Sequence, residues 1–494
     1  MAGVPTDSSE GHEPSDGGDG APEDAAQLRA LFRRLLDSDE MLGFLRRELP
    51  GWSEEPLDVL DCGVKPAKTV QSRKAVRTGR SGFVFRLTVA RASGRTQEVV
   101  LLGRAPVGEG FPGPELGRRA AQLREHPAVA PFQRLAGRIP ALRLGLLLFP
   151  LDPDLPALAE ITGLDAPQLL APHLPECRAG GRLVECSWEL RHYKPGERAV
   201  LRVRAGFAPG SATTEARHVY VKLFDDEHGA VSHRLLRALQ ETARGSQWLR
   251  VPEPLGYDAA RRMLVLAEIP GGRALAEWIH CLEHSTPLPV GVDLGRVESA
   301  VLAAARALAE LQRSDVRPAA TRSFADVLAT LRKDRDLLQN GAYEAEPELV
   351  ARSLALVQRL ESYAPVDELL VPSHGGARHK QTVGDEHGLT FIDWDGFCLA
   401  NPALDAATFL TRLGLEAMTN PGAAPELAHL VERFRAEFLA RSRASACDLL
   451  LYEGVVLTEQ ALRSFRRSAR DAHPPVLPMI GAAEQRLDRS ASRG

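Results

Sequence analysis

The most informative part of this sequence is three neighbouring stretches: His374-Gly375-Gly376-Ala377-Arg378-His379-Lys380-Gln381, Thr390-Phe391-Ile392-Asp393-Trp394-Asp395 and Asn401-Pro402-Ala403-Leu404-Asp405. The second stretch is an apolar strand that ends in an aspartate. A carboxylate at a strand end presents the hard oxygen ligand that Mg²⁺ prefers, so Asp393 is a candidate metal ligand. Asp405 lies near the start of a helix, where its side chain can cap backbone N–H groups.

Together the three stretches resemble the motifs H-G-D-x-x-x-x-N, I-D-W-[DE] and D-P-x-x-D of the aminoglycoside phosphotransferase and choline kinase family. The resemblance covers roughly residues 184–475. It implies an α+β, two-lobed protein-kinase-like fold with ATP and Mg²⁺ as cofactors. It also implies that Asp393 is the metal-binding catalytic residue, that His374 orders the catalytic loop, and that Asp405 belongs to the scaffold.

Two further segments fit the same family. Residues 219–224 read Val-Tyr-Val-Lys-Leu-Phe and alternate as a strand does. In the family the equivalent strand carries the lysine that holds the α- and β-phosphates, which implies this role for Lys222. Residues 264–272 resemble the hinge between the lobes, so backbone groups near Glu268 and Ile269 are expected to pair with adenine.

The chain departs from the family pattern where the chemistry occurs. Gly376 occupies the position of the catalytic aspartate, and glycine has no side chain that could act as a base. Gln381 occupies the position of the metal-binding asparagine. Its amide offers the same carbonyl oxygen one methylene further out, so we expect weaker metal binding. Asn401 replaces the aspartate of the D-P dipeptide.

The acidic partner of Lys222 is a further departure. The best alignment of the helix expected over residues 230–242 places Ser232 where the family has a paired glutamate. Glu227 and Glu241 stay as alternatives, although neither fits the register.

Other groups could replace the missing base. Asp395 lies two residues after Asp393, and His374 could serve although ordering the loop is its expected role. The pair Asp385–Glu386 is flanked by glycines at 384 and 388, which favours a hairpin turn.

These features leave two functions open. General base catalysis contributes about 10²- to 10⁴-fold to a rate, whereas positioning and electrostatics supply most of the acceleration in phosphoryl transfer. One function is therefore a weak ATP-dependent phosphotransferase acting on a small hydroxylated metabolite. The alternative is a catalytically inactive pseudokinase that serves as a nucleotide-binding or scaffold protein. Gly376 favours the pseudokinase, and the joint survival of Lys222 and Asp393 favours the enzyme.

The chain is predicted to fall into five parts. Residues 1–25 form a disordered acidic tail that is rich in Gly, Ser and Pro and lacks Lys and Arg. Residues 26–175 form an N-terminal α/β module, 184–272 the N-lobe and hinge, 273–475 the helical C-lobe, and 476–494 a C-terminal tail.

The N-terminal module allows more detailed expectations. A single helix is expected over residues 25–49, and the proline-rich stretch 150–175 is expected to be a linker or surface loop. The hairpin over residues 82–102 resembles the one after residue 184, with Arg104 placed like Lys222. This suggests a degenerate N-lobe-like repeat, and chance similarity explains it equally well.

Composition excludes several classes of function. The formal net charge of −4 argues against a nucleic-acid partner, which needs a basic surface. No signal peptide is expected, because the N-terminus lacks a basic region followed by an apolar run. No membrane span is expected, because no stretch of about 18 consecutive apolar residues occurs. The six cysteines lack a C-x-x-C pair, which is typical of reduced thiols in a cytoplasmic protein. The expected partners are a small-molecule acceptor and a protein bound through residues 26–175.

Overall fold

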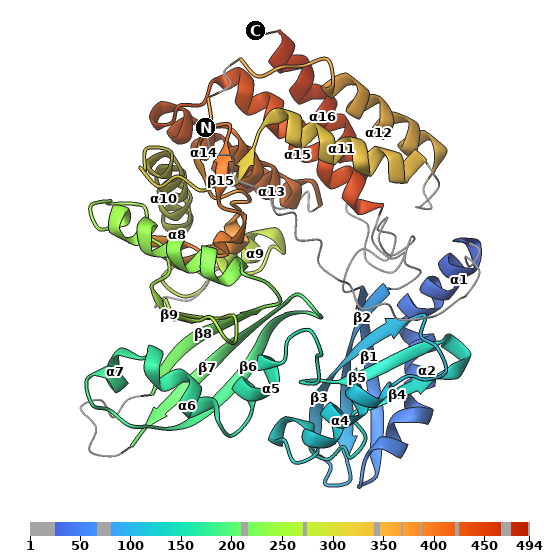
Figure 1. Cartoon of the computed structure of the whole chain (residues 1–494). Helices are drawn as coiled ribbons and strands as arrows, with labels where there is room; N and C mark the ends of the chain where they lie inside the picture. Colours follow the sequence, from blue (N-terminus) through green and yellow to red (C-terminus); the bar gives the residue numbers. More distant parts are fainter. Residues whose placement is uncertain are drawn as a thin grey trace, which may run out of the picture.

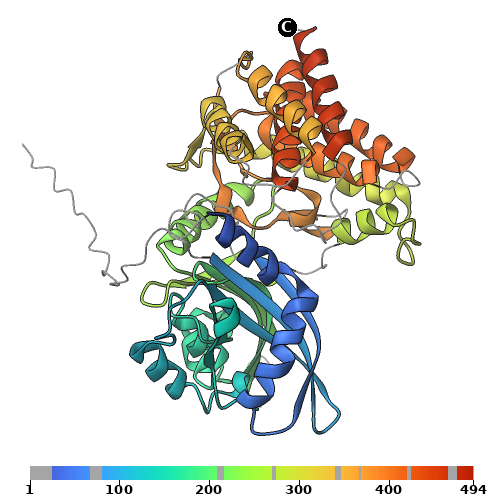
Figure 2. The same ribbon diagram turned by 90° about the vertical axis from the view of Figure 1, so that its right-hand side faces the viewer.

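The computed structural model describes residues 25–66, 81–208, 216–269, 274–339, 346–366, 369–385, 388–419, 424–465 and 476–492. The predicted tail before Ala25 and the end of the hinge, residues 270–273, lie outside this range. The described chain forms an N-terminal module, a sheet lobe and a helical lobe (Figure 1). Figure 2 shows the N-terminal module and the sheet lobe together on one side of the helical lobe.

The N-terminal module packs helices on an antiparallel sheet. Its elements are α1 (Ala25–Leu36), α2 (Ser38–Glu48), η1 (Leu49–Trp52), β1 (Leu57–Pro66), β2 (Ser81–Arg91), β3 (Thr96–Ala105), α4 (Pro114–Gln122), β4 (Ala136–Ile139) and β5 (Leu144–Leu148). The single helix predicted over residues 25–49 is wrong. The chain breaks at Asp37, whose carboxylate accepts the N–H groups of Asp39 and Glu40 and so starts a new helix.

The proline-rich stretch after residue 150 is not a surface linker. It forms α5 (Ala157–Thr162), α6 (Ala166–Leu170), η4 (Ala171–His173) and α7 (Pro175–Arg178). Pro156, Pro167, Pro172 and Pro175 each lie within one residue of the first residue of a helix, where the missing N–H has no cost. Leu158, Ile161 and Leu170 are fully buried in one core with the sheet lobe. Packing therefore joins this stretch to the second sheet.

The sheet lobe consists of β6 (Leu183–Lys194), β7 (Arg198–Phe207), β8 (Arg217–Phe224), α8 (His228–Ala243), β9 (Pro254–Asp258) and β10 (Met263–Ala267). Its strand order is β6-β7-β8-β10-β9, and that of the first sheet is β1-β2-β3-β5-β4. In both sheets one helix separates the third strand from the fourth. The degenerate repeat stays a prediction, and this shared order supports it.

The helical lobe carries short strands in its interior. Its helices are α9 (Ala274–Glu283), α10 (Leu294–Leu311), α11 (Phe324–Gln339), α12 (Pro347–Leu360), α13 (Leu404–Thr419), α14 (Ala424–Arg441), α15 (Ala446–Ser464) and α16 (Val476–Ala491). The inserted elements are β11 (Thr321–Arg322), β12 (Val371–Ser373), η5 (His379–Gln381), β13 (Thr382–Asp385), β14 (Gly388–Phe391), η6 (Trp394–Gly396) and β15 (Cys398–Ala400). The predicted α+β, two-lobed architecture is confirmed.

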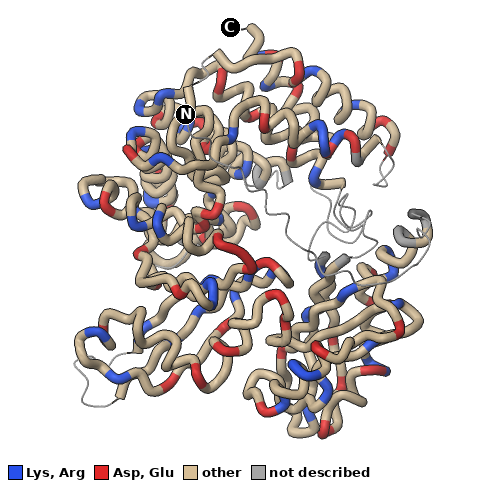
Figure 3. Tube along the Cα trace, viewed as in Figure 1, with Lys and Arg blue, Asp and Glu red and all other residues tan. Residues whose placement is uncertain are grey.

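Two surface properties bear on possible partners. Basic and acidic residues are interspersed over all parts of the described trace, and neither sign collects over one lobe (Figure 3). None of the helices in the described ranges is both long and apolar enough to cross a membrane.

The predicted C-terminal tail is instead a packed helix. Met479, Ile480, Ala483 and Leu487 of α16 are fully buried. A Cβ at Gly454 of α15 would lie 2.8 Å from Leu487 Cδ2, so the two helices meet at van der Waals contact. Helix α16 is thus part of the core of the helical lobe.

This packing predicts the effect of shortening Leu487. Leu487→Ala should destabilise the helical lobe by about 2–5 kcal/mol, because it removes buried methyl groups and leaves a cavity. Leu477→Ala is the matched control, since Leu477 lies on the same helix and is 49% exposed. Its effect should stay within about 0.5 kcal/mol. Urea unfolding followed by circular dichroism measures both, and equal unfolding midpoints would contradict the packing of α16.

Candidate active site

A charged cluster joins the two lobes. Lys222 lies on β8, where it pairs in register with Leu264 of β10 and Val200 of β7. Its side chain is only 12% exposed, and its Nζ lies 3.4 Å from Asp393 Oδ1 and 3.2 Å from Asp395 Oδ1. Burial lowers the pKa of Lys222, and the nearby Asp393 partly offsets that effect. The lysine predicted from the strand therefore reaches the predicted aspartate across the lobe boundary.

Asp393 has a backbone conformation that is unusual for a residue with a side chain. It follows β14 with φ 69° and ψ 53°, in the left-handed region that aspartate tolerates better than most residues. Burial alone would raise its pKa. The positive charges of Lys222 and Arg198 and a hydrogen bond from Gln381 outweigh burial and lower the pKa to about 2. The carboxylate is therefore ionised at neutral pH and can bind a cation.

Gln381 stands beside Asp393 on η5. Its Nε2 donates a hydrogen bond to Asp393 Oδ2 at 3.2 Å. Its Oε1 is buried and has no hydrogen-bond partner among the described residues. An unsatisfied buried acceptor next to an ionised carboxylate is the oxygen donor set that Mg²⁺ prefers, so the pair fits this metal.

Arg198 completes the cluster, and it was not among the residues predicted from the sequence. Its guanidinium pairs with the carboxylate of Asp395 and lies 3.7 Å from Asp393 Oδ1. Arg198 is the first residue of β7, directly after the turn at residues 195–197. A basic residue right after the first turn of the sheet lobe is the only signal in the sequence that could have indicated it.

The two acidic alternatives for pairing with Lys222 are wrong. Glu227 lies 3.7 Å from Arg262, and Glu241 pairs with Arg244. Ser232 is buried on α8, and its alignment to the family position stays a prediction. Asp393 and Asp395 take the place of the missing glutamate because their carboxylates lie within reach of Lys222 Nζ.

The catalytic loop is held by Asp405, at the start of α13. Its Oδ2 accepts the backbone N–H of His374 at 2.5 Å, and its Oδ1 accepts those of Gly375 at 3.0 Å and Ala377 at 3.5 Å. Three hydrogen bonds from one carboxylate fix the path of this loop. This geometry agrees with the scaffold role that the resemblance implies for Asp405.

His374 is buried in the same loop. It is 1% exposed, and it packs against Trp394 with ring centroids 4.7 Å apart. Burial lowers its pKa, so the imidazole is neutral and donates from Nε2 to the carbonyl of Ile392 at 3.0 Å. His374 thereby ties the loop to the residue before Asp393. This contact orients Asp393, and a direct catalytic role of His374 stays a prediction.

The two glycines of the loop differ in a way that matters for function. Gly375 has φ +81°, and a Cβ there would collide with the carbonyl oxygen of Gly396. At Gly376, by contrast, a Cβ would meet no described atom within 4 Å. The fold thus requires glycine at 375 and leaves room for a larger side chain at 376.

A cavity of about 930 Å³ lies between the lobes at this cluster. Basic side chains dominate its wall: Arg191, Lys194, Arg198, Arg202, Lys222, Arg378 and Lys380. Its acidic side chains among the described residues are Glu268 and Asp393. Such an excess of positive charge suits a ligand with several negative charges, such as a polyphosphate.

The predicted hinge forms part of the wall of this cavity. Glu268 and Ile269 both line it, as expected, together with Leu266 and Ala267. The Glu268 carboxylate pairs with Arg202 at 2.7 Å and lies 3.4 Å from His218 Nδ1. The backbone N–H of Glu268 donates to the carbonyl of His218. The predicted pairing of these backbone groups with adenine stays a prediction.

Comparison with known proteins places this site in a family. Residues 210–447 match the model of the phosphotransferase enzyme family. No curated protein matches the chain. The similar solved structures include a macrolide 2'-phosphotransferase from Brachybacterium faecium, with 16% identity, a TM-score of 0.41, and coverage of 64% of this chain and 97% of that one.

Two further structures are similar to this chain. A putative aminoglycoside phosphotransferase from Ralstonia eutropha has 12% identity and a TM-score of 0.42, and the match covers 65% of this chain and 98% of that one. A glucosamine kinase in complex with glucosamine, ADP and inorganic phosphate has 14% identity and a TM-score of 0.39, with coverage of 88% and 94%. The family match contains Lys222, the catalytic loop, Asp393 and Asp405. Residues 210–447 thus match the model of the phosphotransferase enzyme family, and the described chain has the two-lobed α+β architecture expected for it, preceded by an extra N-terminal module.

Proposed function

We propose that this chain is an ATP- and Mg²⁺-dependent phosphotransferase that acts slowly on a hydroxyl group of a small metabolite. The observation that carries the proposal is the meeting of Lys222, Asp393 and Gln381 at one basic cavity. Burying a lysine and an aspartate costs solvation free energy that their attraction only partly offsets, so an apolar pair could join the lobes equally well. A phosphate and a metal ion, by contrast, need these charges.

Each residue has a defined task in this proposal. Lys222 and Arg198 bind the phosphate oxygens, and Asp393 and Gln381 would hold Mg²⁺. When bound, Mg²⁺ neutralises charge that develops on the transferred group. Asp405 and His374 act as positioning residues, because they fix the loop and the carboxylate that contact the ligands. Burial of Lys222 excludes water and strengthens its attraction to phosphate.

The proposed rate is low because no base is in place. Gly376 offers none, and the Asp395 carboxylate is already paired with Arg198 and Lys222. The side chain of Asp385 and all of Glu386 fall outside the described residues, while β13 and β14 pair as the hairpin expected there. Losing a general base costs about 10²- to 10⁴-fold in rate. Positioning and electrostatic stabilisation are retained.

The second candidate function is a pseudokinase that binds nucleotide or a protein without transferring phosphate. Gly376 favours it, because the fold has room for an aspartate that the sequence does not supply. Residues 26–175 would then be the surface for a protein partner. We propose a cytoplasmic location for either function, supported by six free cysteines.

Nucleotide binding tests the site itself. Calorimetry with ATP should show binding that Mg²⁺ strengthens at least about tenfold, or about 1.4 kcal/mol. Asp393→Ala should abolish this gain because it removes the metal ligand. The variant should bind metal-free ATP at least as tightly as the unchanged protein does, because it lacks the carboxylate that competes with phosphate for Lys222.

Asp226→Ala is the matched control for this measurement. Asp226 is exposed, pairs with His228 and lies outside the cavity wall. This variant should have the same ATP affinity as the unchanged protein, both with and without Mg²⁺. If neither the unchanged protein nor the variants bind ATP at millimolar concentration, the nucleotide site does not function and the proposal is wrong.

Restoring the carboxylate tests whether its loss limits the rate. Gly376→Asp should raise basal ATP hydrolysis by at least about tenfold, a fraction of the 10²- to 10⁴-fold that a general base supplies. Water is the acceptor in this assay, so the natural substrate need not be known. The open space at Gly376 predicts an unchanged melting temperature.

Gly376→Asn separates chemistry from shape, because an amide has nearly the same size and accepts no proton. The enzyme proposal expects Asn to leave hydrolysis at the level of the unchanged protein. Equal rates for the Asp and Asn variants would show that the missing base is not what limits turnover, which favours the pseudokinase.

A further inference from the structure

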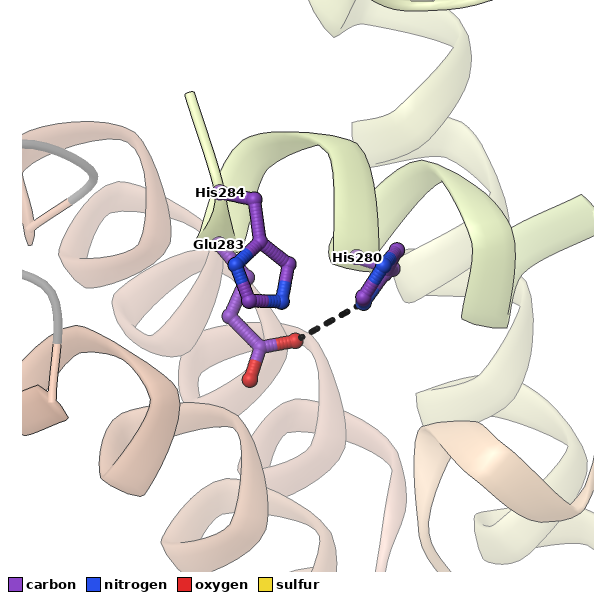
Figure 4. Close-up of side chains that lie close together, drawn as sticks. All are labelled: His280, Glu283 and His284. Atoms are coloured by element: carbon purple, nitrogen blue, oxygen red, sulfur yellow. Dashed lines mark ion pairs between the residues drawn. The ribbon is translucent and has the colours of Figure 1, made fainter. Parts of the chain in front are cut away.

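A second group of metal-ligating side chains lies away from the nucleotide cavity, on α9. His280, Glu283 and His284 each offer one ligand atom, and these atoms all lie within 4.8 Å of one another. Figure 4 shows the two imidazoles and the carboxylate turned toward one another at the end of the helix. None of the three lines the cavity between the lobes. We propose that this group is a Zn²⁺ site.

The positions of the three residues follow from helical geometry. Residues at i, i+3 and i+4 share one face of a helix, so His280 is followed on its own face by Glu283 and His284. The N–H of His284 donates to the carbonyl of His280 at 3.1 Å. This hydrogen bond continues the helical turn one residue past Glu283 and keeps both imidazoles on one face.

The distances suit a zinc ion after small side-chain rotations. Zinc binds imidazole nitrogen at about 2.0–2.1 Å, which puts neighbouring ligand atoms of a tetrahedron about 3.3 Å apart. His280 Nδ1 already lies 3.7 Å from Glu283 Oε2, and the ring centroids of the two histidines are 4.2 Å apart. The His280 side chain is 63% exposed, so it can turn between rotamers without disturbing the core.

The chemistry of the ligands selects the metal. Two imidazoles and one carboxylate are typical of zinc sites with three protein ligands, in which water takes the fourth position. Mg²⁺ prefers oxygen ligands and keeps several waters, so it should bind these three side chains only weakly. Glu283 is 8% exposed and provides a buried carboxylate beside the two exposed imidazoles. The site therefore differs in metal preference from the oxygen pair at Asp393 and Gln381.

Because of where α9 packs, a bound ion should stabilise the helical lobe. Helix α9 packs against η5 and β13, and Gln381 lies at the end of η5. An ion that links His280 to His284 closes the last turn of α9. Because zinc binds the folded helix and an unfolded chain only weakly, it should raise the melting temperature of the lobe.

Zinc titration of the untagged full chain tests the site. Calorimetry should show one Zn²⁺ bound per chain, and Co²⁺ in place of zinc should produce visible absorption bands from a tetrahedral site with nitrogen ligands. His280→Ala and His284→Ala should each lower the affinity for Zn²⁺ by at least about 10- to 100-fold. Mutating even a residue that only hydrogen-bonds to a metal ligand costs that much, and these two histidines are the ligands themselves. Both should abolish the Co²⁺ bands and the rise in melting temperature.

Two variants control for binding elsewhere. His429→Ala removes another exposed histidine that lies 3.0 Å from a glutamate, Glu298, but belongs to no three-ligand group among the described residues. Asp393→Ala removes the proposed Mg²⁺ ligand. Both should keep zinc binding and the Co²⁺ bands. No zinc binding by the unchanged protein, or equal binding after His280→Ala, would overturn the site whatever the outcome for ATP.

Discussion

The pairing of Lys222 with Asp393 and Asp395 is the interaction on which the rest of the site depends. It joins the sheet lobe to the helical lobe, because its lysine comes from β8 and its carboxylates follow β14. Buried charges are stable only when they are paired, so removing either partner would leave an uncompensated charge between the lobes. Arg198 adds a second positive charge to the same carboxylates. These two positive charges keep Asp393 ionised, and further Arg and Lys side chains of the wall make the cavity basic.

The scaffold of the site is better preserved than its chemistry. Asp405 still holds three backbone N–H groups of the catalytic loop, and His374 still ties that loop to Ile392. The departures lie at Gly376, which has no side chain, and at Gln381, which reaches Asp393 in spite of its extra methylene. A chain that binds nucleotide and transfers phosphate slowly, or not at all, fits this combination. The open space at Gly376 shows that packing did not force the loss of the aspartate.

The sequence predicted the parts whose signal is local. Alternating strands such as β8 and the helices of the C-lobe were found, and the spacing from His374 to Asp405 indicated the fold. Arg198 was missed, because its contact with Asp395 spans nearly 200 residues and no local pattern reports it. Helix α16 was missed because Pro478 and Gly481 weaken its helical pattern, and its contacts with α15 and α12 stabilise it. The prolines between 150 and 175 suggested a linker, although they start short helices.

The most direct test is a crystal structure of the chain with a non-hydrolysable ATP analogue and Mn²⁺, whose anomalous scattering locates the ion. The account predicts a Mn²⁺ peak bound by the Asp393 carboxylate and the Gln381 amide oxygen. It also predicts phosphates against Lys222 and Arg198, with Arg198 released from Asp395. An empty cavity at millimolar analogue, with Arg198 still paired to Asp395, would contradict the account and leave the chain as a scaffold with the fold of a phosphotransferase.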